Sequence, residues 1–311
     1  MRVPIRSLSV LACTVAVLLA ASAATAQIED QVGEYMDTNG EAYLQPLADA
    51  IGASLNGGIW HTAFIPEEGF YVSFETHLLA VYFDDDQRTF TYTPMPGDNE
   101  PIDTASLETP TVVGDPAGVV IETESLPYIA TVPGFNMNSF ALAVPQLRIG
   151  AYMGTEATIR YIAIDAGDTE IGNMKLMGFG ARHSVTQWLG ADFPVDIAAG
   201  FFWQNFELGE GLIDATAMTF GAMAGKEIQS GFAIIEPYFG LSYDTFKMDV
   251  SYDYEEDDQQ TTAIDLEMES DASIRATIGL HVSAGFLDLN GEYNFGNMNG
   301  FAAGVGFKFQ S

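Results

Sequence analysis

The sequence predicts an all-β protein, a transmembrane antiparallel β-barrel of about twelve strands, within a range of ten to fourteen, that follows a short N-terminal helical segment. Three observations support this fold class. Apolar and polar residues alternate with period two in successive segments. The chain is rich in glycine (31 residues) and phenylalanine (21 residues). It also begins with an export signal. Apolar residues make up 48 % of the chain, which argues against disorder.

The first 26 residues have the three parts of a secretory signal peptide. Arg2 and Arg6 supply the positive start, Leu8–Ala21 is apolar, and small residues precede a cleavage site after Ala26. A retained membrane anchor and a lipid attached to Cys13 are the alternatives. Because Cys13 is the only cysteine, cleavage leaves a mature protein without disulfides, thiol catalysis or cysteine metal ligands.

The C-terminal segments show the alternation most clearly. Residues 274–283, 287–295 and 301–309 each place apolar side chains on one face and polar or small ones on the other, as a half-buried strand does. Short turns separate them. A secreted β-sandwich is the alternative. A polar face of glycine, serine and asparagine, opposite an apolar face that ends in aromatics, favours a membrane barrel.

Twelve segments qualify as strands, and an even number is typical of single-chain bacterial barrels. They are Gly58–Ile65, Phe70–Phe83, Arg88–Thr93, Ser139–Tyr152, Glu156–Asp165, Ile171–Val185, Val195–Leu208, Leu212–Glu227, Phe232–Tyr254, Thr261–Ser283, Phe286–Phe295 and Phe301–Phe309. The barrel therefore occupies residues 58–311. Long acidic connections fall on its outer side and tight turns on the other. The two longest strands are expected to project as a hairpin beyond the membrane.

Two segments lie outside this pattern. Residues 27–57 precede the barrel, and Glu41–Ile51 carries apolar residues at helical spacing. We expect either a plug or periplasmic docking helix, or an amphipathic lead-in at the barrel mouth. Residues 95–137 contain six prolines with acids between them. We expect an acidic extracellular loop there, which either folds over or into the lumen or remains a flexible surface loop.

Alternation also assigns side chains to the inside of the barrel. The acids expected inside are Glu75, Glu156, Asp196, Glu236, Asp288 and Glu292. One hypothesis is a channel lining that orients solute, formed by Arg148, Arg160, Arg182, Arg275, Glu236, Glu292 and Lys308. The other is an ion-pair network that fills the lumen and holds the barrel shut, which requires that the charges satisfy one another.

None of the four histidines completes a chemical site in the sequence. Glu75 and His77 share a strand face, which is compatible with a metal or a base, but no third member is evident. His281 and Ser283 also share a face without a third catalytic partner. We therefore expect no metal, no cofactor and no enzymatic activity, with a lipid-modifying barrel enzyme as the less favoured alternative.

Eleven basic residues against 43 acidic residues give a formal net charge of −32. Such a surface repels phosphate backbones, so nucleic acid is excluded as a partner. The acidic segments contain no spaced Asp-x-Asp-x-Asp-Gly pattern of a calcium loop. We attribute the excess of acid to life in high salt.

Several tracts resemble parts of a known protein family. They are Tyr43–Gly52, Leu55–Gly58, His61–Ala63, Thr109–Gly114, Pro237–Tyr243 and Gly291–Asn294. On these tracts the chain resembles an uncharacterised family of exported bacterial proteins of unknown function, a resemblance that implies an outer-membrane barrel and no established activity. A weaker similarity is to long-chain fatty-acid transporters, which also have a segment before the barrel, although their plug motif is not visible here.

The C-terminal Phe307-x-Phe309 is similar to the signal read by the barrel-assembly machinery, apart from the two residues that follow it. We therefore expect the bacterial outer membrane as the location. The expected partners are outer-membrane lipid, the assembly machinery through Phe301–Phe309, and an unidentified small solute. The leading hypothesis is a passive or facilitated pore for small or amphipathic solutes. The alternative is a closed structural or adhesive barrel with acidic outer loops.

Overall fold

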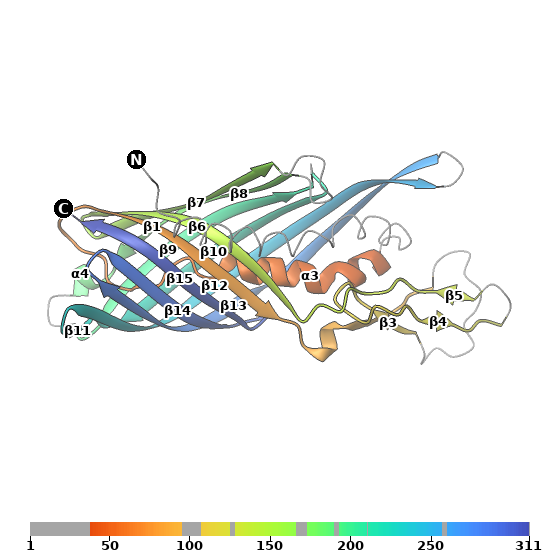
Figure 1. The fold of residues 1–311 in the computed structure, drawn as a ribbon, viewed down its shortest axis with the longest axis horizontal. Helices are drawn as coiled ribbons and strands as arrows, with labels where there is room; N and C mark the ends of the chain where they lie inside the picture. Colours follow the sequence, from red (N-terminus) through yellow and green to blue (C-terminus); the bar gives the residue numbers. More distant parts are fainter. Residues whose placement is uncertain are drawn as a thin grey trace, which may run out of the picture.

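The computed structural model describes residues 38–94, 107–124, 128–165, 173–189, 193–209, 211–256 and 260–310. The predicted signal peptide, residues 27–37 and residues 95–106 of the predicted loop lie outside the described residues. The described chain is a closed antiparallel barrel with one long helix at one end (Figure 1). Among the described residues, no helix combines the length and the apolar character needed to cross a membrane.

Ten strands form the barrel wall. They are β1 (Tyr71–Tyr82), β6 (Ser139–Tyr152), β7 (Thr155–Asp165), β8 (Asn173–Ser184), β9 (Asp196–Leu208), β10 (Ile213–Gly225), β12 (Ala233–Glu256), β13 (Gln260–Ala284), β14 (Leu287–Phe295) and β15 (Gly300–Gln310). Each pairs with the next wall strand along the chain, and β15 pairs with β1 from Tyr71↔Gln310 onward. The ring is therefore closed, which removes the open sheet edge that invites aggregation.

The closed antiparallel barrel confirms the predicted all-β architecture, but ten strands replace the expected twelve. Gly58–Ile65 is not a strand, because it crosses the inside of the barrel in an irregular conformation. Arg88–Thr93 contributes only β2 (Thr89–Thr91), which pairs with β3 (Glu108–Pro110) outside the barrel. A short apolar segment that is buried on all sides has the same sequence pattern as a strand, although it pairs with no other strand.

The wall strands separate an apolar outer face from the interior. Buried and exposed residues alternate strictly along β7 from Thr155 to Ala163. On the outer face the large apolar side chains are open to the surroundings: Phe74 is 57 % exposed, Tyr161 57 % and Phe179 53 %. The wall therefore carries an apolar outer belt.

The helix α3 (Thr38–Asn56) occupies the end of the barrel opposite the C-terminus (Figure 1). Its apolar side chains and inward residues of the wall form one buried cluster, which includes Leu44, Ile51 and Leu55 of the helix and Leu79, Leu176 and Met248 of the wall. Gly52 permits the close approach of helix and wall, because a Cβ atom there would lie 2.7 Å from the Phe246 ring. This half of the interior is therefore an apolar core.

The connection between β1 and β6 covers the outer end of the helix. It contains η1 (Asp85–Gln87), the β2–β3 pair, and β4 (Val120–Ile121) paired with β5 (Ile129–Ala130), all beyond the barrel end (Figure 1). Val112 donates its backbone N–H to the Tyr43 carbonyl at 3.0 Å. Asn39 exchanges two hydrogen bonds with the backbone of Thr93. The described parts of the predicted loop thus fold over the helix.

The two ends of the barrel differ in their connections. Tight turns lie at the C-terminal end, together with α4 (Thr186–Leu189) and β11 (Ile228–Ser230) (Figure 1). At the other end, the β12–β13 hairpin reaches farther than its neighbours (Figure 1). Along β12 the outer face changes from apolar at Tyr243 to charged at Lys247 and Asp249, while Met248 stays buried inside. The hairpin therefore continues beyond the apolar outer belt.

Candidate functional site

After α3 the chain crosses the other half of the interior as residues 57–65, here called the lumen segment, before β1 begins. Ile59, Trp60 and His61 are all buried, and His61 is 0 % exposed. The lumen segment has no strand partner. Because buried backbone N–H and C=O groups require partners, the inward side chains of the wall must supply them.

The wall side chains do bind the backbone of residues 55–63. Three arginines donate to backbone carbonyls: Arg160 to Leu55 and Gly57 (both 2.9 Å), Arg275 to Asn56 (2.7 Å) and Arg182 to Thr62. Two glutamates accept from backbone N–H groups: Glu292 from Gly58 (3.0 Å) and Glu236 from Ala63 (2.7 Å). Five of the seven residues predicted to line a pore are therefore in contact with the chain that fills it.

The other two predicted lining residues also lie inside the wall. Arg148 is 1 % exposed and bridges two carboxylates, with Glu75 at 2.6 Å and Glu156 at 3.1 Å. Lys308 lies near the C-terminal end, with its ammonium 5.8 Å from the centre of the Tyr71 ring. The alternation thus predicted which way all seven side chains point, but it did not predict that the space they face is occupied.

The buried charges form a continuous ion-pair chain from Glu75 through Arg148 and Glu156 to Arg182. Arg182 bonds Glu156 at 2.6 Å through Nε, and the Tyr71 hydroxyl donates to the same carboxylate. Removing such charges from water is costly, and only several good hydrogen bonds at each group offset the cost. Glu75 and Glu156, the two carboxylates of this chain, each accept several hydrogen bonds.

Arg160 differs from its neighbours. Among the described residues it has no carboxylate within ion-pair distance, and its guanidinium instead meets the Gln146 side chain and two backbone carbonyls. It also lies 5.5 Å from the centre of the Phe202 ring, within the range of a cation–π contact. The charge of Arg160 is therefore satisfied chiefly by the end of α3 and the start of the lumen segment.

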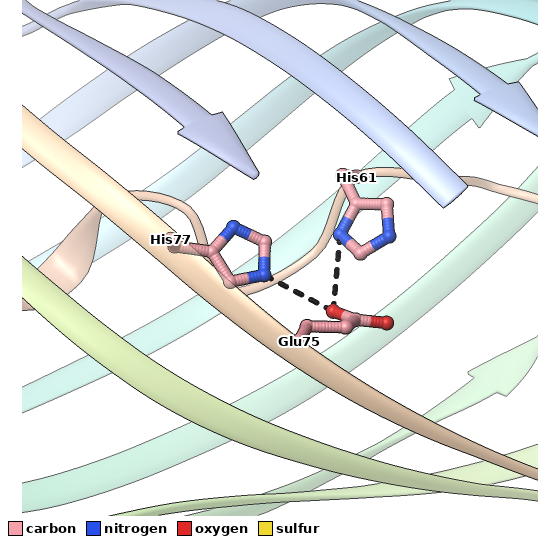
Figure 2. Close-up of side chains that lie close together, drawn as sticks. All are labelled: His61, Glu75 and His77. Carbon is pink, nitrogen blue, oxygen red and sulfur yellow. Dashed lines mark hydrogen bonds and ion pairs between the residues drawn. The ribbon is translucent and has the colours of Figure 1, made fainter. Parts of the chain in front are cut away.

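A second group in this half of the interior is the histidine cluster, which consists of His61, Glu75 and His77. Figure 2 shows both imidazole rings directed at one carboxylate oxygen of Glu75. His77 Nε2 lies 3.0 Å and His61 Nδ1 3.8 Å from Glu75 Oε2. The other oxygen, Oε1, accepts from Arg148 at 2.6 Å and from Ser73 at 2.7 Å. The two oxygens of this carboxylate therefore serve different partners.

His281 lies next to the histidine cluster. Its ring centre is 5.3 Å from that of His61, the same distance as between His61 and His77. The His281 nitrogens lie 3.7 Å from Glu236 and 3.5 Å from Asp288. Three imidazoles and three carboxylates thus gather within one buried region of the lumen.

The sequence identified Glu75 and His77 as neighbours on one face but missed His61 as the third member. Alternation places residues only along strands, and the lumen segment has no regular structure. Only the path of the chain through the barrel brings His61 opposite β1. At that position the sequence offered one signal, the resemblance of the tract His61–Ala63 to an exported family. This resemblance does not identify a ligand or a catalytic role for His61.

Small cavities lie beside α3 and the lumen segment. Three cavities that border α3 and the lumen segment have volumes of about 20, 40 and 20 Å³. Such volumes hold one or a few water molecules each. This closed packing favours the ion-pair network over a permanently open channel lining.

The pairing of β6 with β7 is incomplete. Their pairing ends at Gln146↔Arg160, whereas β6 continues back to Ser139 along β1 and β7 continues to Asp165 along β8. The gap begins at Pro145, which has no N–H to donate. A groove of about 820 Å³ on the outer wall borders this point and is lined mainly by apolar residues, including Phe74, Leu78, Ile159, Tyr161, Val305 and Phe307.

The sequence matches one protein family over nearly its whole length. A family model described as a family of unknown function (DUF6588) matches residues 5–309. No curated protein sequence matches the chain.

One similar solved structure is the translocator domain of the autotransporter NalP from Neisseria meningitidis, with 12 % identity over 86 % of this chain and 96 % of that chain and a TM-score of 0.37. OmpT from Vibrio cholerae has 10 % identity over 77 % of this chain and 98 % of that chain, with a TM-score of 0.27. A FadL homologue from Pseudomonas aeruginosa has 9 % identity over 88 % of this chain and 97 % of that chain, with a TM-score of 0.26. These likenesses concern the barrel fold alone.

Proposed function

This chain belongs to the DUF6588 family of unknown function, and we propose that it is an outer-membrane barrel closed at rest by its lumen segment. A small or amphipathic solute passes when that segment moves. The observation that carries the proposal is the set of hydrogen bonds between five inward charged residues and the backbone of residues 55–63, in which three arginines donate and two glutamates accept. The proposal combines the predicted pore with the closed network that the interior contains.

Two features support the outer membrane as the location. The outer face of the wall carries an exposed apolar belt with aromatic residues, as lipid-facing walls do. The sequence predicts an export signal with cleavage after Ala26, and the assembly machinery is expected to bind Phe301–Phe309. In β15 the side chains of Phe301, Phe307 and Phe309 are 45 %, 47 % and 59 % exposed, which leaves them available to that partner and to lipid.

The chemistry of the two halves of the interior favours a reversible closure over a permanent one. A lumen filled with apolar side chains would be as stable as, or more stable than, one filled with buried ion pairs. The half around α3 is filled in that apolar way, but the half around the lumen segment is not. When the lumen segment leaves and α3, which runs directly into it, moves with it, each group that held the segment is hydrated and a polar route through the barrel opens.

The groove beside β6 and β7 favours an amphipathic or apolar solute. It lies on the lipid-facing wall where one strand pair is incomplete, and the buried apolar cluster around α3 lies behind it. A solute with an apolar part therefore has a binding surface on the wall and an apolar interior beside it. A small ion requires neither an apolar binding surface on the wall nor an apolar interior.

Planar-bilayer conductance of the refolded mature protein tests the closure. We expect the unmodified barrel to be nearly silent. The double variant Arg160→Ala/Arg275→Ala should show discrete steps, because the Asn56 and Gly57 carbonyls lose their arginine donors and the Leu55 carbonyl keeps only Gln204. Folding of every variant is checked by heat-modifiable migration on a gel.

A disulfide provides the matched control. A Cβ atom at Gly225 would lie 3.3 Å from the Ala63 Cβ, close to the separation of about 3.5–4.5 Å in disulfides, and 2.5 Å from Glu236 Oε1, so the Glu236 side chain must shift to admit it. In the opened variant, Ala63→Cys with Gly225→Cys should silence the steps when oxidised, and reduction should restore them. Steps that persist with the disulfide closed would contradict the proposal. Silence of every folded variant would favour the structural or adhesive barrel.

A further inference from the structure

We propose that His61, Glu75 and His77 form a binding site for one divalent transition-metal ion of the zinc type. The metal would tie the lumen segment, which carries His61, to wall strand β1, which carries Glu75 and His77. The site itself stands on the geometry of the cluster. Only its effect on opening rests on the proposed function.

The ligand atoms are correctly placed for such an ion. One atom from each residue lies within 4.8 Å of the other two, and all three side chains are buried. The separations of 3.0 and 3.8 Å to Glu75 Oε2 bracket about 3.4 Å, the distance between ligands in tetrahedral zinc with bonds of about 2.0–2.1 Å. Two imidazoles and one carboxylate are a set that zinc, cobalt, nickel and copper accept.

The histidine rings lack other partners. Both ring nitrogens of His61 and Nδ1 of His77 are buried without a hydrogen bond in the described structure. A buried imidazole without partners is unfavourable, so such groups normally indicate a role that the protein side chains alone do not show. A metal ion would use one nitrogen of His61 and the Nε2 of His77 directly.

The charge of the described interior also favours a cation. Six carboxylates are buried there: Glu75, Glu156, Glu236, Asp244, Asp288 and Glu292. The compensating cations are the buried Arg148, Arg160 and Arg182, together with Arg275, whose side chain is 12 % exposed. With neutral histidines these groups sum to −2, or to −1 when the inward-pointing Lys308 is included, so the interior favours a bound cation.

The surroundings of the cluster resemble the supporting shell of a metal site. Metal-binding carboxylates are usually oriented by further hydrogen bonds, and Glu75 has them: Arg148 and Ser73 hold Oε1, while Oε2 faces the histidines and accepts from Gln146 at 3.3 Å. On β15, Gly304 leaves room for the His77 ring, because a Cβ there would lie 2.7 Å from its Nδ1. His281, 5.3 Å from His61 between ring centres, is the nearest candidate for a fourth ligand.

The test uses the full mature chain refolded in detergent with Co²⁺ or Zn²⁺ and then freed of excess metal. We expect one equivalent per barrel by elemental analysis, and for Co²⁺ a visible absorption band of tetrahedral type. His61→Ala and His77→Ala should each weaken binding by more than about 100-fold, since even indirect partners of a metal contribute 10- to 100-fold. His183→Ala, outside the cluster, should bind as the unmodified barrel does.

Three outcomes separate the two proposals. A folded, heat-modifiable barrel that binds no metal above the level of His61→Ala overturns the site, whatever the conductance shows. Binding that is equal in His61→Ala, His77→Ala and His183→Ala overturns it as well. If the metal binds through the cluster but its removal leaves opening in the Arg160→Ala/Arg275→Ala variant unchanged, the site stands and its link to the closure fails.

Discussion

Individual buried charges in this barrel differ in how they are satisfied. Arg148 and Arg182 depend on one shared carboxylate, Glu156, which is 0 % exposed. Arg160, by contrast, depends on the backbone carbonyls of Leu55 and Gly57, where α3 passes into the lumen segment. A substitution at Glu156 therefore tests the stability of the wall, whereas one at Arg160 tests the closure.

We predict that Glu156→Gln lowers the free energy of unfolding by about 3–5 kcal/mol, because Arg182 loses its carboxylate partner and Arg148 keeps only Glu75. The matched control is Glu207→Gln. Glu207 pairs with Lys175 on the surface, where the side chains are 40 % and 49 % exposed, and such pairs contribute at most about 1 kcal/mol. Urea unfolding of the refolded barrels, followed by tryptophan fluorescence, measures both. Equal losses would show that Glu156 does not support the network.

Alternation was sufficient to predict the inward direction of Arg148, Arg160, Arg182 and Glu236, because a wall strand fixes the side of every second residue. It was insufficient for His61. The position of His61 depends on how residues 57–65 cross the lumen, and nothing periodic encodes that path. The residues of the histidine cluster that lie on β1 were thus predictable, and the one on the lumen segment was not.

At the level of elements, the same limit explains the strand count. Gly58–Ile65 matches a strand in composition and length, yet it has no backbone partner and relies on side chains such as Glu292 and Gln146. The helix was predictable because Glu41–Ile51 keeps helical spacing, and α3 includes all of it. Its location inside the barrel was one of the open alternatives, since an amphipathic pattern does not identify what it packs against.

We predict that Gly52→Ala destabilises the barrel by about 1–3 kcal/mol, the usual cost of forcing extra volume into a packed core. The added Cβ would lie 2.7 Å from the Phe246 ring, so helix or ring must shift. Phe246→Leu should relieve part of the loss in the double variant, and Glu41→Ala, at an exposed position of the same helix, serves as control. Additive losses at Gly52 and Phe246 in urea unfolding would argue against this contact.

The incomplete pairing of β6 and β7 gives a prediction for backbone protection. Amides of Tyr161–Asp165 that face β6 should exchange hydrogen faster than those of Thr155–Arg160, where the ladder is intact. Exchange of refolded protein in micelles, resolved to short peptides by mass spectrometry, measures the difference. The paired stretch of β9 with β10 is the internal standard. Uniform protection along β7 would mean that the strands close in solution.

The whole molecule has three zones along the barrel axis. At one end α3 and the β1–β6 connection form an apolar core, in the other half charged side chains hold the lumen segment, and an apolar belt surrounds the wall. The acids of the interior are compensated mostly by arginines, so the bulk of the net charge of −32 lies elsewhere. Exposed residues such as Asp84–Asp86, at the end with the long connections, carry part of it.

This distribution of charge predicts that salt stabilises the folded barrel. Raising NaCl from about 0.01 M to about 1 M shortens the screening length from about 30 Å to about 3 Å, which weakens repulsion between exposed acids and leaves buried pairs less affected. The midpoint of thermal unfolding should therefore rise. In the triple variant Asp84→Asn/Asp85→Asn/Asp86→Asn the rise should be smaller, since part of the repulsion is already gone. A midpoint that falls with NaCl would mean that surface pairs such as Arg88 with Asp85 outweigh the repulsion, and the adaptation to high salt inferred from composition would then have no support in the stability of the molecule.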